Sequence, residues 1–187
     1  MKKIMRNFAA MLLLAFGLPL SSHAQLISAD VGVDGLTCSM CARGTEETMK
    51  RLDFIDTMWV DLNTLVAHIQ FKKDMSAPIE DIIKGVEDAG FSVRNITGIF
   101  EFTGQKIGKD EHVDYASDVL HFVGVSDRTL DGKVALRFID KPFVSKKEFK
   151  EWANKTTMSC YKKNKQDDCC PSNTTKSKHL FHVTIAS

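Results

Sequence analysis

The alternation of strand-like and helix-like segments between Ile27 and Ile96 constrains the fold more than any other feature of the chain. Strands are predicted in "SADVGVDG", "IDTMWVDL", "LVAHIQF" and "FSVRNI", where apolar and polar residues alternate. Helical spacing of apolar residues predicts one helix from about Cys41 to Leu52 and another in "SAPIEDIIKGVEDAGF". This order is that of the ferredoxin-like βαββαβ arrangement. We therefore predict an α+β fold with a ferredoxin-like domain over residues 27–97.

The rest of the chain has a different composition and a different pattern of apolar residues. Residues 98–110 are glycine-containing and charged, which is typical of a linker. Strands are then predicted in "VLHFVGV", "KVALRFI" and "HLFHVTIA", with turn residues in the intervening "DRTLDG" and a short helix in "SKKEFKEWANK". We predict a second small α+β unit, of unknown function, over residues 111–187.

The N-terminus resembles a secretory signal peptide. Three basic residues precede an apolar run of 13 residues, and small residues then lead up to Ala24. The pattern predicts a signal peptide over residues 1–24, cleaved near Ala24, and hence a periplasmic or secreted protein. The run is shorter than the ~20 residues that span a bilayer, so we expect no membrane association after cleavage. A retained N-terminal anchor is the alternative.

Charge and motifs point to a binding protein. The chain has 25 basic and 24 acidic residues, without a basic stripe of the kind that nucleic-acid binding requires. The sequence shows no phosphate-binding glycine loop, no paired carboxylates at a recognisable spacing and no nucleophile with a base. We therefore expect neither a nucleic-acid partner nor an enzyme.

The segment "GLTCSMC" places Cys38 and Cys41 where a loop becomes a helix. A helix N-terminus favours thiolate, and two intervening residues allow both sulfur atoms to reach one ion. Structural zinc usually takes four protein ligands, whereas this segment offers two thiolates, which select Cu(I). We predict Cu(I) as the ion, with Zn(II), Hg(II) and Ag(I) as alternatives. Met40 either faces solvent, covers the site or supplies a third soft ligand.

Residues 27–96 resemble the heavy-metal-associated domain family, which includes copper chaperones and the metal-binding domains of copper-transporting ATPases. The similarity lies in "GLTCSMC", "TEETMKRL", "VDL", "AHIQF" and "EDAGF", in this order. It implies that Cys38 and Cys41 are the metal ligands, that Phe91 packs beneath the loop, and that another metal-carrying protein or a transporter is the partner. Leu36 replaces the family's usual methionine. Thr37 replaces the aspartate of zinc-exporting relatives, which favours copper. The C-terminal region resembles no family that we recognise.

Two other interpretations of the pair stay open. The first is a periplasmic thiol–disulfide redox protein, because a CxxC motif at a helix N-terminus also describes thioredoxin-like proteins. Against it, Thr37 precedes the first cysteine, and Pro78 is expected to begin a helix. The second is a resting disulfide between Cys38 and Cys41 in an oxidising compartment.

The chain has five cysteines, and the other three are near its C-terminus: Cys160, Cys169 and Cys170. They predict either a disulfide across a polar loop or a second metal site that also uses His121, His179 or His182. His179 and His182 are three residues apart, so on a strand they face opposite sides and do not both reach one ion unaided.

Overall fold

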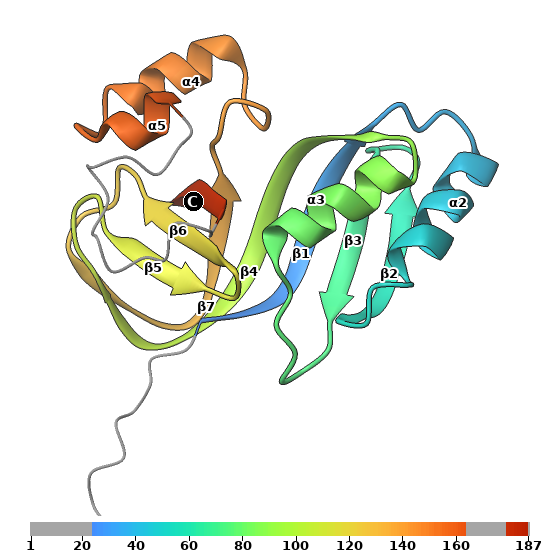
Figure 1. The fold of residues 1–187 in the computed structure, drawn as a ribbon, viewed down its shortest axis with the longest axis horizontal. Coiled ribbons are helices and arrows are strands. Elements are labelled where there is room, and N and C mark those ends of the chain that lie inside the picture. The colour runs from blue at the N-terminus through green and yellow to red at the C-terminus, as the bar shows by residue number, and fades with distance from the viewer. Residues whose placement is uncertain (1–23, 164–178, 187) are drawn as a thin grey trace, which may run out of the picture.

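A mixed sheet of eight strands organises the described part of the computed structural model, residues 24–163 and 179–186 (Figure 1). The strands are β1 (Gln25–Asp34), β2 (Ile55–Asp61), β3 (Val66–Phe71), β4 (Ser92–Ile107), β5 (His112–Tyr115), β6 (Asp118–Phe122), β7 (Arg128–Phe138) and β8 (His179–Ile185). The helices are α2 (Ser39–Met49), α3 (Ile79–Asp88), α4 (Lys146–Ala153) and α5 (Ser159–Lys163). Across the sheet the strand order is β2-β3-β1-β4-β7-β8-β6-β5.

The first four strands and two helices form the predicted ferredoxin-like arrangement. β1 is antiparallel to β3 on one edge and to β4 on the other, and β2 pairs with β3. α3 buries Ile79, Ile82 and Val86, which belong to the apolar stripe that helical spacing predicted. α2 buries Thr45 and Met49. Both helices cover the same face of the sheet (Figure 1), so the α+β prediction is confirmed for this part of the chain.

β4 continues through most of the segment that we expected to be a linker. It pairs with β1 along one edge and with β7 along the other, as far as Ile107 opposite Arg128. Residues 98–107 are therefore strand, contrary to the linker predicted at 98–110. Gly98 has a packing role instead: a Cβ at this position would lie 2.8 Å from both Leu26 and Phe100. The prediction treated this glycine as a linker residue.

The C-terminal segments complete the same sheet. β8, predicted as the final strand, lies between β7 and β6, antiparallel to the first and parallel to the second. The helix predicted near Ser145 is α4, and Ser145 caps it by accepting a hydrogen bond from Glu148 N–H at 3.2 Å. The predicted turn "DRTLDG" is wrong from Arg128 onward, because the extension of β4 gives these residues a strand partner. β5 and α5 were not predicted.

One hydrophobic core joins the two parts of the chain. It includes Val31 and Ile69 from the ferredoxin-like part, Phe100 from β4, and Phe122 and Phe138 from later strands. A separate second α+β unit is therefore not confirmed. Two smaller buried clusters lie under α4 and α5.

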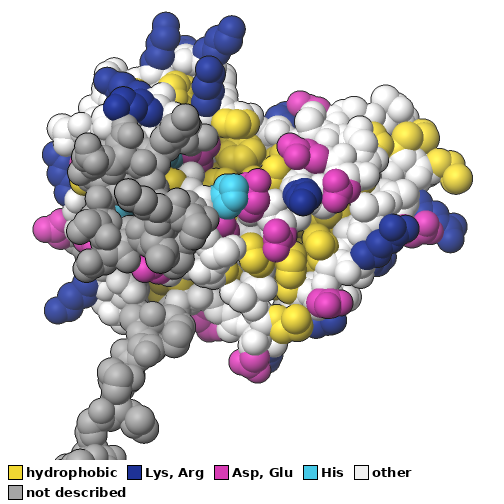
Figure 2. Space-filling view, viewed as in Figure 1, with side chains coloured by type: hydrophobic (Ala, Val, Ile, Leu, Met, Phe, Trp, Pro, Cys, Tyr) yellow, Lys and Arg dark blue, Asp and Glu magenta, His cyan; other side chains and the backbone are white. Residues whose placement is uncertain are grey.

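Two hydrogen bonds tie the β5–β6 hairpin to the start of α3. The Tyr115 hydroxyl donates to the carbonyl oxygen of Ala77 at 3.0 Å, and the Asp118 carboxylate accepts from Ile79 N–H at 2.6 Å. A carboxylate at a helix N-terminus satisfies an unpaired backbone N–H and interacts favourably with the helix dipole. Acidic side chains gather where α3 begins (Figure 2), and Glu80 and Asp81 occupy its first turn.

Several predictions lie outside the described residues. These are the signal peptide up to residue 23 and the roles of Cys169 and Cys170. Within the described ranges, no helix has both the length and the apolar character needed to cross a bilayer.

Asp118 should make the stability of the protein depend on pH. Burial, with smaller effects from Glu80 and Asp81, raises the pKa of this carboxyl from 3.8 to about 6. A raised folded-state pKa gives stability that is complete below the unfolded pKa and is lost as pH rises through about 6. Between pH 4 and pH 7 we expect the unfolding free energy to fall by up to about 3 kcal/mol relative to Asp118→Asn.

Chemical denaturation of the two proteins across this pH range measures the difference. Asp56→Asn, at an exposed position of β2, is the matched control and should follow the parent protein. Parallel pH profiles for the parent and Asp118→Asn would contradict the assignment.

Candidate metal centre

The loop between β1 and α2 is anchored on the side that faces the core. Gly35 has a φ of +95°, a region that glycine adopts without strain. A Cβ at this position would lie 3.3 Å from the Phe91 ring, so the ring lies against the loop. Leu36 is 3% exposed and belongs to the main core. The loop is therefore held by Leu36 and Phe91, while the residues that follow reach solvent.

Cys38 is the N-cap residue of α2. Its backbone is extended, with φ −154° and ψ 161°, and its Sγ accepts a hydrogen bond from Cys41 N–H at 3.4 Å. The helix consequently begins at Ser39, two residues before the predicted start. Cys41 lies in the first turn, half-buried, and packs against the core. The helix N-terminus thus presents one exposed sulfur and one anchored sulfur.

The two sulfur atoms are 2.8 Å apart, and both residues are thiols. The Cys38 side chain, followed by contacts with Thr37, lowers the pKa of Cys41 from its ordinary value despite partial burial. A lowered pKa increases the fraction of thiolate, which is the form that binds metal. The structure therefore brings together the two residues that the sequence predicted as ligands.

An ion between these sulfurs needs more room than 2.8 Å. With ion–sulfur bonds of about 2.3 Å, tetrahedral to linear angles correspond to sulfur separations of about 3.8 to 4.6 Å. Rotation of the exposed Cys38 side chain opens this distance at the cost of one long hydrogen bond. Cys41 is fixed by the core and by its place in the helix.

Met40, between the two cysteines, is 76% exposed. It faces solvent, which is one of the three roles expected from the sequence. Nearby charges on α2 pair along the helix, with Arg43 Nε 3.0 Å from Glu47 Oε1. Exposed pairs of this kind contribute little to stability.

The structure separates the three histidines proposed for a second site. Cys160, on α5, is buried with its Sγ 3.6 Å from His121 Nδ1 on β6. His179 is exposed and 3.5 Å from Glu80, whereas His182 is buried and 2.6 Å from Asp140. Only His121 of the three expected histidines lies next to Cys160 in a candidate metal-binding group, and that group also contains His112.

His112 was missed by sequence reasoning, although a signal for it existed. The segment "HVDYASDVLH" forms a hairpin with two residues, Ala116 and Ser117, between Tyr115 and Asp118. A two-residue turn at this position places His112 directly opposite His121. Recognition of the hairpin would have predicted the pair.

The ferredoxin-like part of the chain matches a known protein family. The family model described as "Heavy-metal-associated domain" matches residues 30–92, which include Cys38 and Cys41. The resemblance found in the sequence is confirmed for this part of the chain.

Individual relatives each match about a third of the chain. A copper-transporting ATPase of Helicobacter felis is 32% identical over 65 residues, which make up 35% of this chain and 9% of that protein. Among solved structures, a copper-binding domain from HMA7, a P-type ATPase, is 30% identical with a TM-score of 0.34, covering 36% of this chain and 89% of that one. The CopZ metallochaperone is 21% identical with a TM-score of 0.33, covering 35% and 97%. The chain therefore spans less than a tenth of the ATPase.

The pKa of Cys41 should depend on its neighbour. Cys38→Ala removes the largest interaction that lowers this pKa, so we expect the midpoint of Cys41 alkylation by iodoacetamide to move to higher pH. Peptide-resolved mass spectrometry of reduced, metal-free protein separates Cys41 from the other cysteines. Met40→Leu, a change at an exposed position, is the control and should leave the midpoint in place. An unchanged midpoint in Cys38→Ala would refute this interaction.

Proposed function

We propose that the protein captures a soft metal ion, above all Cu(I), through Cys38 and Cys41 and passes it to a partner by ligand exchange. The observation that carries the proposal is the pair of adjacent thiols at the N-terminus of α2, within the part of the chain that matches the heavy-metal-associated domain. The ion is cargo, and the protein acts as a carrier rather than as an enzyme.

The donor set supports Cu(I). Two thiolates are soft ligands, and they leave the coordination shell open to a third ligand from another protein. The relative from Helicobacter felis is named as a copper-transporting ATPase. Zn(II), Hg(II) and Ag(I) are the alternative ions for the same two sulfurs.

Unequal exposure of the two sulfurs gives the transfer an order. A partner thiolate adds to the ion on the exposed side, next to Cys38, and forms a three-coordinate complex. One bond to a thiolate of this protein then breaks, and that thiolate takes up a proton. A second partner thiolate adds, the remaining bond to this protein breaks, its thiolate is protonated in turn, and the ion stays with the partner. Another metal-carrying protein or a transporter with a similar cysteine pair is the partner that this chemistry requires.

Export belongs to the proposal as well. The N-terminal segment has the pattern of a signal peptide cleaved near Ala24, which would place the carrier in the periplasm or outside the cell. In such a compartment a reductant or a bound ion is needed to keep Cys38 and Cys41 from closing into a disulfide.

Cu(I) titration against a competing chelator tests the metal site. We expect Cys38→Ser with Cys41→Ser to lose one equivalent of tightly bound Cu(I) relative to the reduced parent protein. Met40→Leu should retain it, because the exposed side chain is not needed as a ligand. Equal stoichiometry in the parent and the double variant would contradict the assignment of the two cysteines as the metal ligands.

Thiol–disulfide exchange is the second candidate, favoured by the 2.8 Å separation of the sulfurs. The lowered pKa, however, belongs to the half-buried Cys41, whereas exchange also requires access to the attacking thiolate. We expect the reduced protein to show no catalytic turnover in an insulin-reduction assay, with thioredoxin as the positive control. Robust turnover that disappears in the double variant would replace the carrier function with redox catalysis.

A further inference from the structure

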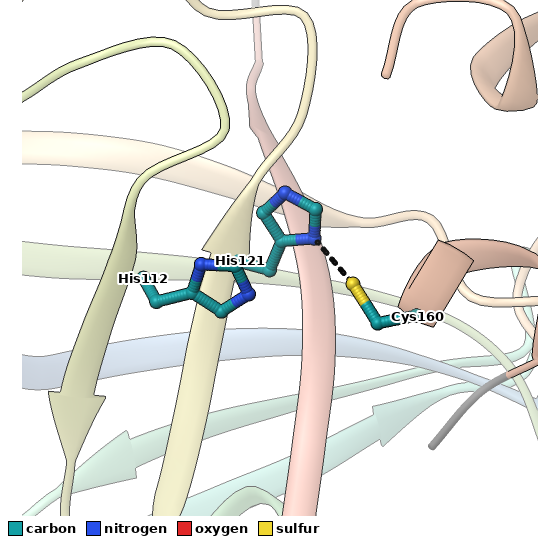
Figure 3. A group of neighbouring side chains, drawn as sticks. All are labelled: His112, His121 and Cys160. Atoms are coloured by element: carbon teal, nitrogen blue, oxygen red, sulfur yellow. Dashed lines mark hydrogen bonds between the residues drawn. The ribbon is translucent and has the colours of Figure 1, made fainter. Parts of the chain in front are cut away.

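Three histidines form a row across adjacent strands at the end of the sheet that carries the β5–β6 hairpin. His112 on β5 lies opposite His121 on β6, which lies beside His182 on β8. The rings of the first two are stacked with centroids 4.3 Å apart, and the second and third meet edge to face at 5.1 Å. Cys160 approaches His121 from α5 (Figure 3).

Polar atoms in this row lack partners. His121 and His182 are fully buried, and the Nε2 atoms of all three histidines have no hydrogen bond within the described structure. The same holds for Oδ1 of buried Asp110, which is 3.4 Å from His121 Nε2 but not aligned for a hydrogen bond. Each unsatisfied buried polar group costs about 1–3 kcal/mol, and a bound ion that took His112 Nε2 as a ligand would remove this cost at that atom.

We propose that His112, His121 and reduced Cys160 form a second metal site, for a first-row ion that accepts both imidazole and thiolate, namely Zn(II) or Cu(I). One ligand atom from each residue lies within 4.8 Å of the other two. This site is independent of Cys38 and Cys41 and does not rest on the carrier function.

The distance between Cys160 and His121 suits a shared ion. Sulfur and nitrogen ligands at about 2.3 and 2.1 Å from one ion are about 3.6 Å apart at a tetrahedral angle. The observed separation of Cys160 Sγ and His121 Nδ1 is 3.6 Å. Since Nδ1 faces the sulfur, Nε2 is left toward Asp110, and a carboxylate in this position commonly orients a metal-binding histidine.

His112 must rotate to complete the site. Its ring is nearly parallel to that of His121, at 9°, so the in-plane lone pairs of the two rings do not converge. Rotation about the Cβ–Cγ bond brings a nitrogen of His112 toward the sulfur side. Its ring is the less enclosed of the two, because His112 is only half-buried whereas His121 is fully buried.

Burial keeps the histidines in the form that binds metal. Desolvation, with smaller effects from His112 and His182, lowers the pKa of His121 to about 3. Burial likewise lowers the pKa of His112. Neutral imidazoles can donate their lone pairs at neutral pH without first losing a proton.

A variant with one cysteine isolates this site. Replacing Cys38, Cys41, Cys169 and Cys170 by serine leaves Cys160 as the sole thiol and removes the carrier site. With Co(II) as the probe, the reduced variant should show a thiolate-to-metal charge-transfer band that saturates at one equivalent. Zn(II) and Cu(I) are then added in separate arms, and the ion that displaces Co(II) at lower concentration is the one that the site prefers. Absence of the charge-transfer band would overturn the proposal.

Further substitutions in this background test the other ligands. Asp110→Asn should weaken binding by about 10–100-fold, and His112→Gln by more, because it removes a ligand rather than a residue that orients one. His179→Gln, at an exposed position on β8, is the matched control and should bind as the parent does. The half-buried His112 is a safer substitution than the buried His121, and circular dichroism verifies its folding. Parent-like Co(II) affinity in folded His112→Gln would overturn the site.

Discussion

The sixteen-residue strand β4 is the constraint on which the rest of the structure depends. Its hydrogen bonds to β1 complete the ferredoxin-like sheet, and its hydrogen bonds to β7 begin the C-terminal half. The backbone groups of a buried strand must be paired on both edges, so neither half can move away without exposing unsatisfied N–H and C=O groups. The aromatic residues of β4 add to this linkage, since Phe100 packs edge to face on Tyr115 and Phe102 on Phe122.

The continuous sheet gives the two candidate metal sites different surroundings. The thiol pair lies at the N-terminus of α2, a helix at the end of the molecule away from β5 and β6 (Figure 1), and Cys38 is exposed there. The histidine row lies on strands of the sheet and Cys160 lies on α5, and these side chains are mostly buried. An exposed two-ligand site leaves the ion open to an incoming ligand, whereas burial of the three-residue group restricts the access of such a ligand.

The C-terminal half also contacts the ferredoxin-like part at the start of α3. Tyr115 and Asp118 bond to backbone groups next to this helix, and burial raises the pKa of both side chains. At neutral pH the charged form of Asp118 loses solvation but gains a short hydrogen bond from Ile79 N–H. The loss of solvation is therefore unfavourable, but the hydrogen bond fixes the start of α3, which lies on the same face of the sheet as α2.

The sequence by itself determined the ferredoxin-like order and the pair Cys38 and Cys41, because periodicity and a short spacing are local signals. It also predicted β8 and α4. Only the tertiary structure decided that 98–107 is strand and that His112, His121 and Cys160 meet. These depend on pairing between segments far apart in the chain: β7 supplies the partner for the second half of β4, and α5 brings a sulfur to a histidine 39 residues away. Glycines and charges in those segments have the composition of a loop, and the composition of a segment does not reveal which distant strand will satisfy its backbone.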